Sequence, residues 1–343
     1  MSNGQPLSGE PAARVLVAGA SGYAGALVAR LAWNHPRLEL VRTTARTDAG
    51  TRLDQLYPDG GVPLLLEEPG AIEPGEFDAA FVAYPHGASA PLVAWLRQEG
   101  AKVVDLSADF RLRDPEVYAR WYGEHEAPEL VADAAYGLPE LNRERIRDAD
   151  LVANPGCYPT ASVLALAPLA EAGLVEDVVI DAQSGISGAG RAAAERMRGV
   201  VEGDDSMAYG VAGHRHAPEI AQELSALGVN GAPLTFVPHL LPFDQGELVS
   251  CYVRTSRGLE AEEIAELYRA RYADEPFVEI VDEPPGVAGV RATNLCRIHV
   301  SVDGESGRAL AFGAIDNLWK GAASQAVQNL NLMLGLPEGE GIS

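Results

Sequence analysis

Short apolar runs alternate with helix-like stretches through the first part of the chain. Runs with the length of buried strands lie at residues 14–18, 38–43, 79–83 and 102–106. Stretches in which apolar residues recur at helical spacing lie at residues 23–33 and 90–99. This alternation of strand and helix predicts a parallel, doubly wound sheet. A short strand at 151–153 and an Ala/Leu/Val-rich helix beginning at Thr160 follow.

The pattern changes in the second half of the chain. Predicted strands lie at residues 178–182, 234–237, 247–253 and 294–302. Predicted helices alternate with them at residues 192–201, 218–227 and 261–272. This arrangement predicts an α+β domain. The last predicted helix, residues 318–334, is long enough to pack back across the first domain.

Composition is that of an ordinary globular protein, and it limits the partners. The 343 residues are 47% hydrophobic and 22% charged, and a chain of this length favours two domains. The formal net charge of -23 disfavours binding to nucleic acid or to an anionic membrane. No apolar run approaches the roughly 18 residues of a membrane span, and the N-terminus lacks a secretory pattern. We therefore expect a cytoplasmic protein with neither nucleic acid nor membrane as a partner.

A glycine-rich turn follows the first predicted strand. Gly19, Gly22 and Gly25 open the following helix, with Ser21 and Tyr23 between them. Glycines at this spacing let backbone N–H groups approach a pyrophosphate at the positive end of a helix. The alternative interpretation is a turn that serves only close packing of strand and helix. Within this strand–helix pattern we predict a dinucleotide site of Rossmann type.

The end of the second predicted strand bears on the choice of cofactor. A site for NAD usually places Asp or Glu there, which accepts hydrogen bonds from the ribose hydroxyls. This chain instead has Arg42, Thr44 and Arg46 around that position. Hydroxyl and guanidinium groups such as those of Thr44 and Arg46 can hold a 2′-phosphate. We therefore predict NADP(H), the alternative being arginines that are merely solvated.

Cys157 is the candidate nucleophile. A predicted strand leads through Asn154, Pro155 and Gly156 to Cys157 at the start of a helix. The positive end of a helix favours thiolate over thiol, and its free N–H groups can stabilise an oxyanion. Asn154 either orients this turn or contacts the substrate. The other cysteines lie within apolar strands, as buried small hydrophobic residues do.

A polar cluster offers groups that handle protons. His214 and His216 flank Arg215, and Glu219 follows them. Imidazole suits proton transfer near neutral pH, and either histidine can take this role. Arg215 is suited to a carboxylate or phosphate, and Glu219 to orienting an imidazole. Zinc binding is the alternative, but nearby Cys and suitably spaced further ligands are lacking, so no metal is expected.

Several further motifs occur in a recognisable order. With the two turns and the histidine cluster, they lie at residues 19–25, 107–111, 136–140, 154–160, 184–191, 214–216, 236–239 and 316–321. Together these segments resemble the N-acetyl-gamma-glutamyl-phosphate reductase family of arginine biosynthesis, which is related to aspartate-semialdehyde dehydrogenases. The resemblance spans nearly the whole chain.

The resemblance implies a reaction and further site residues. It implies that Cys157 attacks the gamma-acyl phosphate of a small substrate and holds a thioester, which NADPH reduces to the semialdehyde. It implies that Ser107, Arg111 and the 214–216 run line the substrate pocket. By the same resemblance, the residues near the nicotinamide half of the cofactor are Ser187, Gly188, Gly190 and Asn317.

The expected fold class is α/β. It comprises an N-terminal Rossmann-type doubly wound parallel sheet, a second α+β domain for substrate binding and dimerisation, and a C-terminal helix packed on the first domain. Residues 1–156 with 317–343 are expected to form the NADP-binding domain, and residues 157–316 the catalytic domain. Strands of the second domain are expected to pair across a two-fold axis in a homodimer or homotetramer.

One segment departs from the family pattern and keeps other functions open. Where family members commonly place an Arg-Gly pair, this chain reads Phe-Asp-Gln-Gly-Glu at residues 243–247, so a pocket cation is missing there. Reduction of aspartyl phosphate or of a carrier-bound aminoadipyl phosphate is the alternative. The acidic chain suits an acidic carrier poorly. A protein that senses NADPH without catalysis is the alternative of another class.

Overall fold

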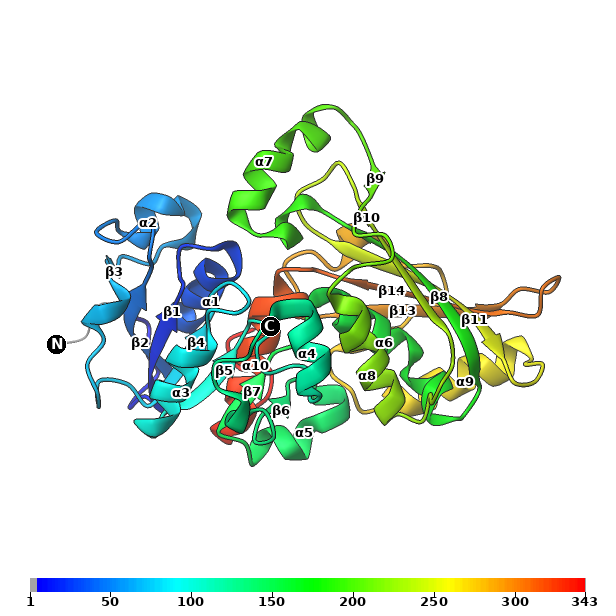
Figure 1. The fold of residues 1–343 in the computed structure, drawn as a ribbon, viewed down its shortest axis with the longest axis horizontal. Coiled ribbons are helices and arrows are strands. Elements are labelled where there is room, and N and C mark those ends of the chain that lie inside the picture. The colour runs from blue at the N-terminus through cyan, green and yellow to red at the C-terminus, as the bar shows by residue number, and fades with distance from the viewer. Residues whose placement is uncertain (1–4, 343) are drawn as a thin grey trace. The chain divides into compact units, whose positions relative to one another are not determined.

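The computed structural model describes residues 5–342, and the chain divides into two compact units. Met1–Pro155 and Ala322–Ser343 form the first unit, and Gly156–Gly321 form the second. Figure 1 labels the helices and strands of both. The chain thus contributes to the first unit twice, and Cys157 lies at the start of the second.

An all-parallel sheet of seven strands forms the centre of the first unit. In spatial order the strands are β3 (Leu66–Glu67), β2 (Leu38–Thr44), β1 (Ala13–Ala18), β4 (Ala79–Val82), β5 (Lys102–Asp105), β7 (Leu151–Ala153) and β6 (Ala135–Tyr136). The strand order changes direction between β1 and β4, which is the switch point of a doubly wound sheet. The central strands are continuous apolar runs because both faces of the sheet are buried. The predicted parallel sheet is confirmed.

Helices of the first unit surround this sheet. They are α1 (Tyr23–Asn34), α2 (Leu53–Leu56), α3 (Ala90–Gln98), α4 (Pro115–Tyr122), α5 (Pro139–Arg147) and α10 (Ser324–Met333). After a π-helical turn at Trp319–Ala323, α10 packs against α1, α5 and β5. Its buried Asn329 donates to Gly137 O and to Asn154 Oδ1, both at 2.9 Å. The expected C-terminal helix on the first domain is confirmed.

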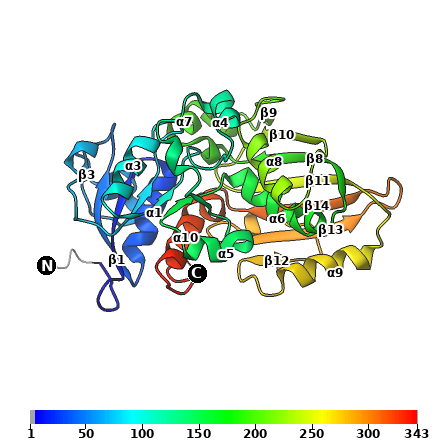
Figure 2. The same cartoon turned by 60° about the horizontal axis from the view of Figure 1, so that its bottom comes forward.

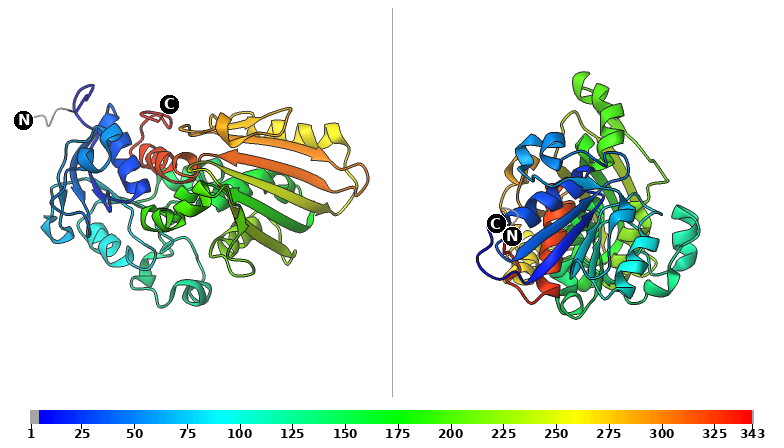
Figure 3. Two further views of the ribbon diagram at one scale, coloured as in Figure 1. Left: turned by 90° about the horizontal axis from the view of Figure 1, so that it is seen from above. Right: turned by 90° about the vertical axis from the view of Figure 1, so that its left-hand side faces the viewer.

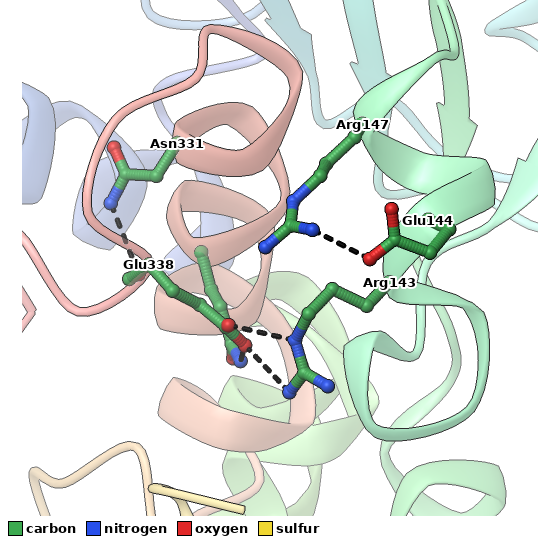
Figure 4. A network of polar contacts seen from close by, with 6 residues as sticks. Arg143, Glu144, Arg147, Asn331 and Glu338 are labelled. Atoms are coloured by element: carbon green, nitrogen blue, oxygen red, sulfur yellow. Dashed lines mark hydrogen bonds and ion pairs between the residues drawn. The ribbon is translucent and has the colours of Figure 1, made fainter.

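The segment after α10 is held to α5 by polar contacts, which Figure 4 shows. Arg143 Nε donates to Glu338 Oε2 at 2.9 Å, and Gln328 Nε2 donates to Glu338 Oε1 at 2.7 Å. Asn331 Nδ2 donates to the backbone oxygen of Glu338 at 3.2 Å. The last residues therefore close over α10 and keep it in the first unit.

A mixed sheet of seven strands forms the centre of the second unit. In spatial order the strands are β12 (Val278–Ile280), β13 (Cys296–Val302), β14 (Ala309–Ile315), β11 (Glu247–Thr255), β8 (Val175–Ser184), β10 (Leu234–Leu240) and β9 (Met207–Ala208). Neighbours are antiparallel except β8 with β10 and β12 with β13. With its helices this sheet confirms the expected α+β domain.

Helices cover one face of the second sheet. They include α6 (Cys157–Glu171), α8 (His216–Ala226) and α9 (Ala261–Tyr272), whereas α7 (Arg191–Glu202) follows β8 and packs on the 3₁₀ turn before it. Figure 2 shows α6 and α8 beside the sheet, and Figure 3 shows α9 along its β12–β13 edge. Along β11 the side chains alternate, so Val249, Cys251 and Val253 are buried while Tyr252 is exposed. No helix within residues 5–342 is both long and apolar enough to cross a bilayer.

Candidate active site at the start of α6

Cys157 is the first residue of α6, and contacts within the second unit hold the turn in front of it. Gly156 caps the helix with extended backbone and offers no side chain. Its N–H donates to Glu219 Oε1 at 2.9 Å, and its carbonyl accepts from Thr160 Oγ1 at 3.0 Å. Cys157 is partly exposed, whereas the other two cysteines are buried. The one accessible thiol in the described part of the chain is thus placed at the positive end of a helix.

His216 packs directly against this turn. A Cβ added to Gly156 would lie 2.5 Å from His216 Nε2, so only glycine leaves room for the imidazole. From another side, a Cβ on Gly321 would lie 2.7 Å from Cys157 Cβ. The sequence left the choice between two histidines open, and the structure places His216 next to the turn that presents Cys157.

His214 lies among aromatic rings, next to His216, Tyr158 and Tyr209. Burial lowers the pKa of His214 to about 4, and the charge of Arg215 acts in the same direction. Its Nδ1 accepts from His216 N at 3.2 Å, and its ring meets the edges of Tyr158 and Tyr209. His214 is therefore neutral near pH 7, and Arg215 is exposed beside it. Among residues 5–342 no group of three or more His, Cys, Asp or Glu side chains is arranged to hold a metal ion.

Residues expected near the nicotinamide meet within the second unit. Asn317 Nδ2 donates to Ser187 Oγ at 2.9 Å, and Asn317 Oδ1 accepts from Gly246 N at 2.7 Å. A Cβ on Gly188 would lie 3.4 Å from Asn317 Nδ2. Gly190 has φ of +80° and precedes α7. These residues come from segments far apart in the sequence and form one hydrogen-bonded cluster.

The loop that departs from the family pattern has a cation from another segment. Arg291 Nε donates to Gln245 O at 2.8 Å, and its guanidinium carbon lies 5.7 Å from the centre of the Phe243 ring. The Gln245 side chain donates to Asp316, which also accepts from the backbone N–H of Ala292. The expectation that this loop lacks an arginine holds for the loop itself, but Arg291 lies against it.

In the first unit the glycine turn is shaped as a close backbone approach. Gly19 has φ of +87°, and a Cβ there would lie 2.5 Å from Ala83 O. A Cβ on Gly25 would lie 2.2 Å from Gly19 O. The N–H of Gly19 donates to Thr44 O at 2.9 Å, which ties the turn to the end of β2. Gly22 caps α1 without a side-chain hydrogen bond, so the first N–H groups of α1 remain open to an anion.

The residues predicted to bind the adenosine side of the cofactor lie at the end of β2. Thr44 is buried, and among residues 5–342 its Oγ1 has no hydrogen-bond partner. Arg46 is exposed, with its guanidinium carbon 4.9 Å from the centre of the Tyr84 ring. Arg42 instead pairs with Glu67 and Glu76. Arg46 is therefore the better placed of the two arginines for a phosphate.

Ser21 and Tyr23 complete this turn. Tyr57 donates its hydroxyl to Ser21 O at 2.8 Å, and the centres of the Tyr57 and Tyr23 rings lie 6.4 Å apart. A cradle that admits only glycine, an open helix end and an unpartnered buried hydroxyl together fit a dinucleotide with a phosphorylated ribose.

Ser107, Arg111 and Asn154 lie in the first unit. Arg111 is hydrogen-bonded to Asn154, and Ser107 to Asp105. Ser107 Oγ donates to Asp105 Oδ2 at 2.6 Å, and burial raises the pKa of Asp105 to about 7. Arg111 Nε donates to Asn154 O at 2.8 Å. Asn154 Nδ2 donates to Ala322 O at 3.1 Å. The contacts of Asn154 support the end of β7, which leads to Cys157, and the Ser107–Asp105 contact lies at the end of the neighbouring strand β5.

Comparison with known proteins identifies the family. Residues 14–149 match the family described as semialdehyde dehydrogenase, NAD binding domain, and residues 157–317 match the semialdehyde dehydrogenase dimerisation domain. N-acetyl-gamma-glutamyl-phosphate reductase of Dehalococcoides mccartyi (strain 195) is 48% identical over 94% of this chain and 95% of its own. The chain belongs to the N-acetyl-gamma-glutamyl-phosphate reductase family. The enzyme of that name from Alkalilimnicola ehrlichii is 49% identical over 95% of this chain and 96% of its own.

Two solved structures have the same fold as this chain. Aspartate semialdehyde dehydrogenase II of Vibrio cholerae, complexed with ASA, superposes with a TM-score of 0.72 at 18% identity, covering 96% of this chain and 99% of its own. Aspartate semialdehyde dehydrogenase of Candida albicans, with NADP, gives a TM-score of 0.70 at 14% identity over 93% and 98% of the two chains. The family resemblance and the nicotinamide dinucleotide cofactor expected from the sequence are confirmed.

Glu247 is a site residue that the family motifs did not indicate. It is fully buried at the start of β11, and no N–H or O–H group among residues 5–342 donates to either carboxyl oxygen. Burial raises the pKa of Glu247 to about 8; the Cys157 thiol opposes this shift and Asp316 adds to it. The signal in the sequence was a charged residue that opens an otherwise apolar strand.

Two tyrosines beside Cys157 were also missed. Tyr209 Oη donates to Tyr158 Oη at 3.1 Å, and burial raises the pKa of both phenols. They therefore stay neutral near pH 7. Tyr158 follows Cys157 directly, but Tyr209 lies in an irregular segment after β9 that has no sequence pattern of its own.

Proposed function

We propose that this chain catalyses the NADPH-dependent reduction of N-acetyl-gamma-glutamyl phosphate to N-acetylglutamate semialdehyde and phosphate, as the names of its relatives suggest. The observation that supports it best is Cys157, partly exposed at the start of α6, with His216 packed against the same turn. Because the nucleophile works as a free thiol, we place the reaction in a reducing compartment, the cytoplasm.

The proposed reaction begins at the sulfur of Cys157. The thiolate attacks the acyl carbon, a C–S bond forms, and the bond from carbon to the phosphate oxygen breaks. Phosphate leaves with the electron pair and takes a proton from His216. The N–H groups at the start of α6 face the place where negative charge develops on the carbonyl oxygen. When bound, the cofactor supplies the hydride that reduces the thioester carbon.

We assign the proton transfer to His216 and a positioning role to His214. His216 Nε2 lies beside the Cys157 turn. His214 is buried, neutral near pH 7, and hydrogen-bonded to the backbone of His216. Glu219 positions the other side of the same turn through Gly156 N–H. Arg215, exposed at the start of α8, is the proposed partner of the substrate's carboxylate or phosphate.

For the cofactor we propose NADP(H), with its pyrophosphate on the Gly19–Gly25 turn. Thr44 offers an unpartnered buried hydroxyl and Arg46 an exposed charge, which suit the 2′-phosphate. Ser187, Asn317, Gly188 and Gly190 are the residues that we propose lie beside the nicotinamide of the cofactor. For the substrate side we propose Ser107 and Arg111, and their contacts support Asn154 as a residue that orients the Cys157 turn.

The exposed face of the second sheet is the proposed subunit interface of a homodimer. Val179 and Tyr252 are paired across β8 and β11 and are 37% and 38% exposed. The match to a dimerisation domain supports this assignment. A Tyr252→Arg variant is expected to shift the mass in light scattering from dimer to monomer, and an unchanged mass would refute this interface.

The test of the proposed function is the reverse reaction. The protein is incubated with NADP⁺, phosphate and either N-acetylglutamate semialdehyde or aspartate semialdehyde, and NADPH formation is followed. We expect a kcat/KM for the first aldehyde at least about 100-fold above that for the second. In a second measurement, intact-protein mass after addition of the acyl phosphate without cofactor should rise by one N-acetylglutamyl group on Cys157. Preference for aspartate semialdehyde, or no adduct, would overturn the proposal.

A further inference from the structure

Glu247 lies opposite Cys157 because of the register of the second sheet. On β14, which pairs with β11, Gly313 is paired with Val249, and a Cβ on Gly313 would lie 3.2 Å from Ala161 O of α6. Glu247 precedes Val249 by two residues on β11, a distance of about 6.6 Å along the strand. Cys157 precedes Ala161 by about one turn of α6, a distance of about 6 Å along the helix. Both steps lead to the same end of the sheet, where Glu247 pairs with Ile315.

The turn after β14 brings the two side chains together. Ile315 is followed by Asp316, whose carbonyl accepts from Gly321 N at 2.9 Å. Gly321 in turn packs on Cys157 so closely that a Cβ there would lie 2.7 Å from Cys157 Cβ. Residues two positions apart on a strand share a face, so Glu247 lies on the same face as Val249 and Cys251, which α6 covers. Glu247 therefore points toward the start of α6.

The groups around the Glu247 carboxyl offer it no donor other than the thiol. The titratable groups that interact with it are Cys157 and the neutral phenol of Tyr158 on α6, and the neutral phenol of Tyr209 after β9. On the turn after β14, the charge of Asp316 also acts on it. The adjacent position on β8 is a serine. An ionised carboxylate in this apolar place is costly, and no arginine, lysine or backbone N–H of the described residues offsets that cost.

We propose that Glu247 and Cys157 share one proton, so that the carboxyl group holds the proton next to the sulfur whenever Cys157 is a thiolate. This inference rests on the proposed function, since it assigns Glu247 as a further catalytic residue of that reaction. The raised pKa of Glu247, about 8, supports it because it brings the carboxyl close to the ordinary range of a thiol.

The shared proton has a place in each step. Before attack, the pair gives up one of its two protons to His216, which later passes it to the phosphate, and the remaining proton stays on Glu247, which leaves thiolate beside a neutral carboxylic acid. While the thioester exists, the carboxylic acid stays neutral and adds no negative charge next to the acyl group. After reduction, the C–S bond breaks, the sulfur keeps the electron pair, and the O–H of Glu247 donates a hydrogen bond to the departing thiolate. One proton thus stays on Glu247 throughout, while the negative charge of the sulfur passes to the leaving phosphate and returns with the hydride.

The test compares Glu247→Gln with the parent by alkylation of Cys157. Iodoacetamide is applied from about pH 5 to about pH 10, and the Cys157 peptide is followed by mass spectrometry. The parent should show two steps, because the pair loses one proton and then the other. Glu247→Gln should show a single step, and its kcat should fall about 10-fold to 100-fold with little change in KM. Identical alkylation profiles and kcat in the two proteins would overturn the proposal.

Two further variants keep the result interpretable. Glu223→Gln changes another buried carboxylate of the same unit, which already accepts from Gln222, and should match the parent in both measurements. Glu247→Leu removes the polar group and should melt at a higher temperature than the parent while losing the two-step profile. Full activity in a folded Glu247→Leu protein would also contradict the proposal. If the parent lacks the proposed reductase activity, the proposed function fails, but the alkylation profile still reports the pair because it needs no substrate.

Discussion

The molecule contains two turns of the same local design, one in each unit. In both, a strand of the first sheet leads to a glycine that caps a helix without a side-chain hydrogen bond, Gly22 before α1 and Gly156 before α6. The nearest atom to an added Cβ is 3.8 Å away at Gly22, but at Gly156 it is His216 Nε2 at 2.5 Å. The same backbone arrangement therefore leaves open space beside the glycine in one case and is packed against the His216 imidazole in the other.

Of the changes that test the difference between the two turns, Cys157→Ser should have the largest effect on turnover. A serine keeps the shape of the turn but is a far weaker nucleophile, so turnover should fall by roughly 1000-fold or more. Binding of NADPH, followed by fluorescence titration, should be unchanged because the glycine turn of the first unit is untouched. Substantial residual turnover would show that the second turn presents no nucleophile.

Replacing the two capping glycines tests the difference directly. Gly156→Ala forces His216 away from the turn, and a misplacement of this size is expected to lower kcat by about 100-fold. Gly22→Ala meets no protein atom closely and should leave kcat near the parent value while raising KM for NADPH. Equal effects of the two variants on kcat, in steady-state assays of both, would contradict the distinction between the turns.

Arg46→Ala probes the ligand side of the first turn. Loss of a charge that faces the 2′-phosphate should raise KM for NADPH by about 10-fold, with KM for NADH unchanged. Arg42→Ala is the matched control, because Arg42 is already paired with Glu67 and Glu76. An Arg42→Ala protein that loses more NADPH affinity than Arg46→Ala would reverse the assignment.

The smallest effect concerns stability and pH. The pKa of Glu247 is raised from 4.5 to about 8 on folding, so the folded state binds the proton more tightly. Its contribution to stability is complete below about pH 4.5 and is lost as the pH rises toward about 8. Urea unfolding of Glu247→Leu should therefore show a weaker loss of stability over this range, by on the order of 1 kcal/mol for each pH unit. Parallel curves for parent and variant would argue against a protonated carboxyl.

The elements predicted from the sequence were those with long apolar runs or clear helical spacing. The strand β14 was missed because small residues, including Gly313, fill it where α6 packs closely. The helix α5 was missed because it is mostly charged and has no apolar stripe. The helix α4 did have a local signal, since Asp114 accepts from Glu116 N at its start and Pro115 follows.

By itself the sequence determined the parallel sheet, the glycine turn and the position of Cys157 at the start of a helix. Each of these follows from backbone preferences that act over a few neighbouring residues. Only the tertiary structure decided that His216 lies against the turn, that Arg291 reaches the divergent loop, and that Glu247 faces Cys157. Those contacts join residues far apart in the chain, and the packing of the second unit sets them, with the register of its sheet placing Glu247, so no local pattern records them.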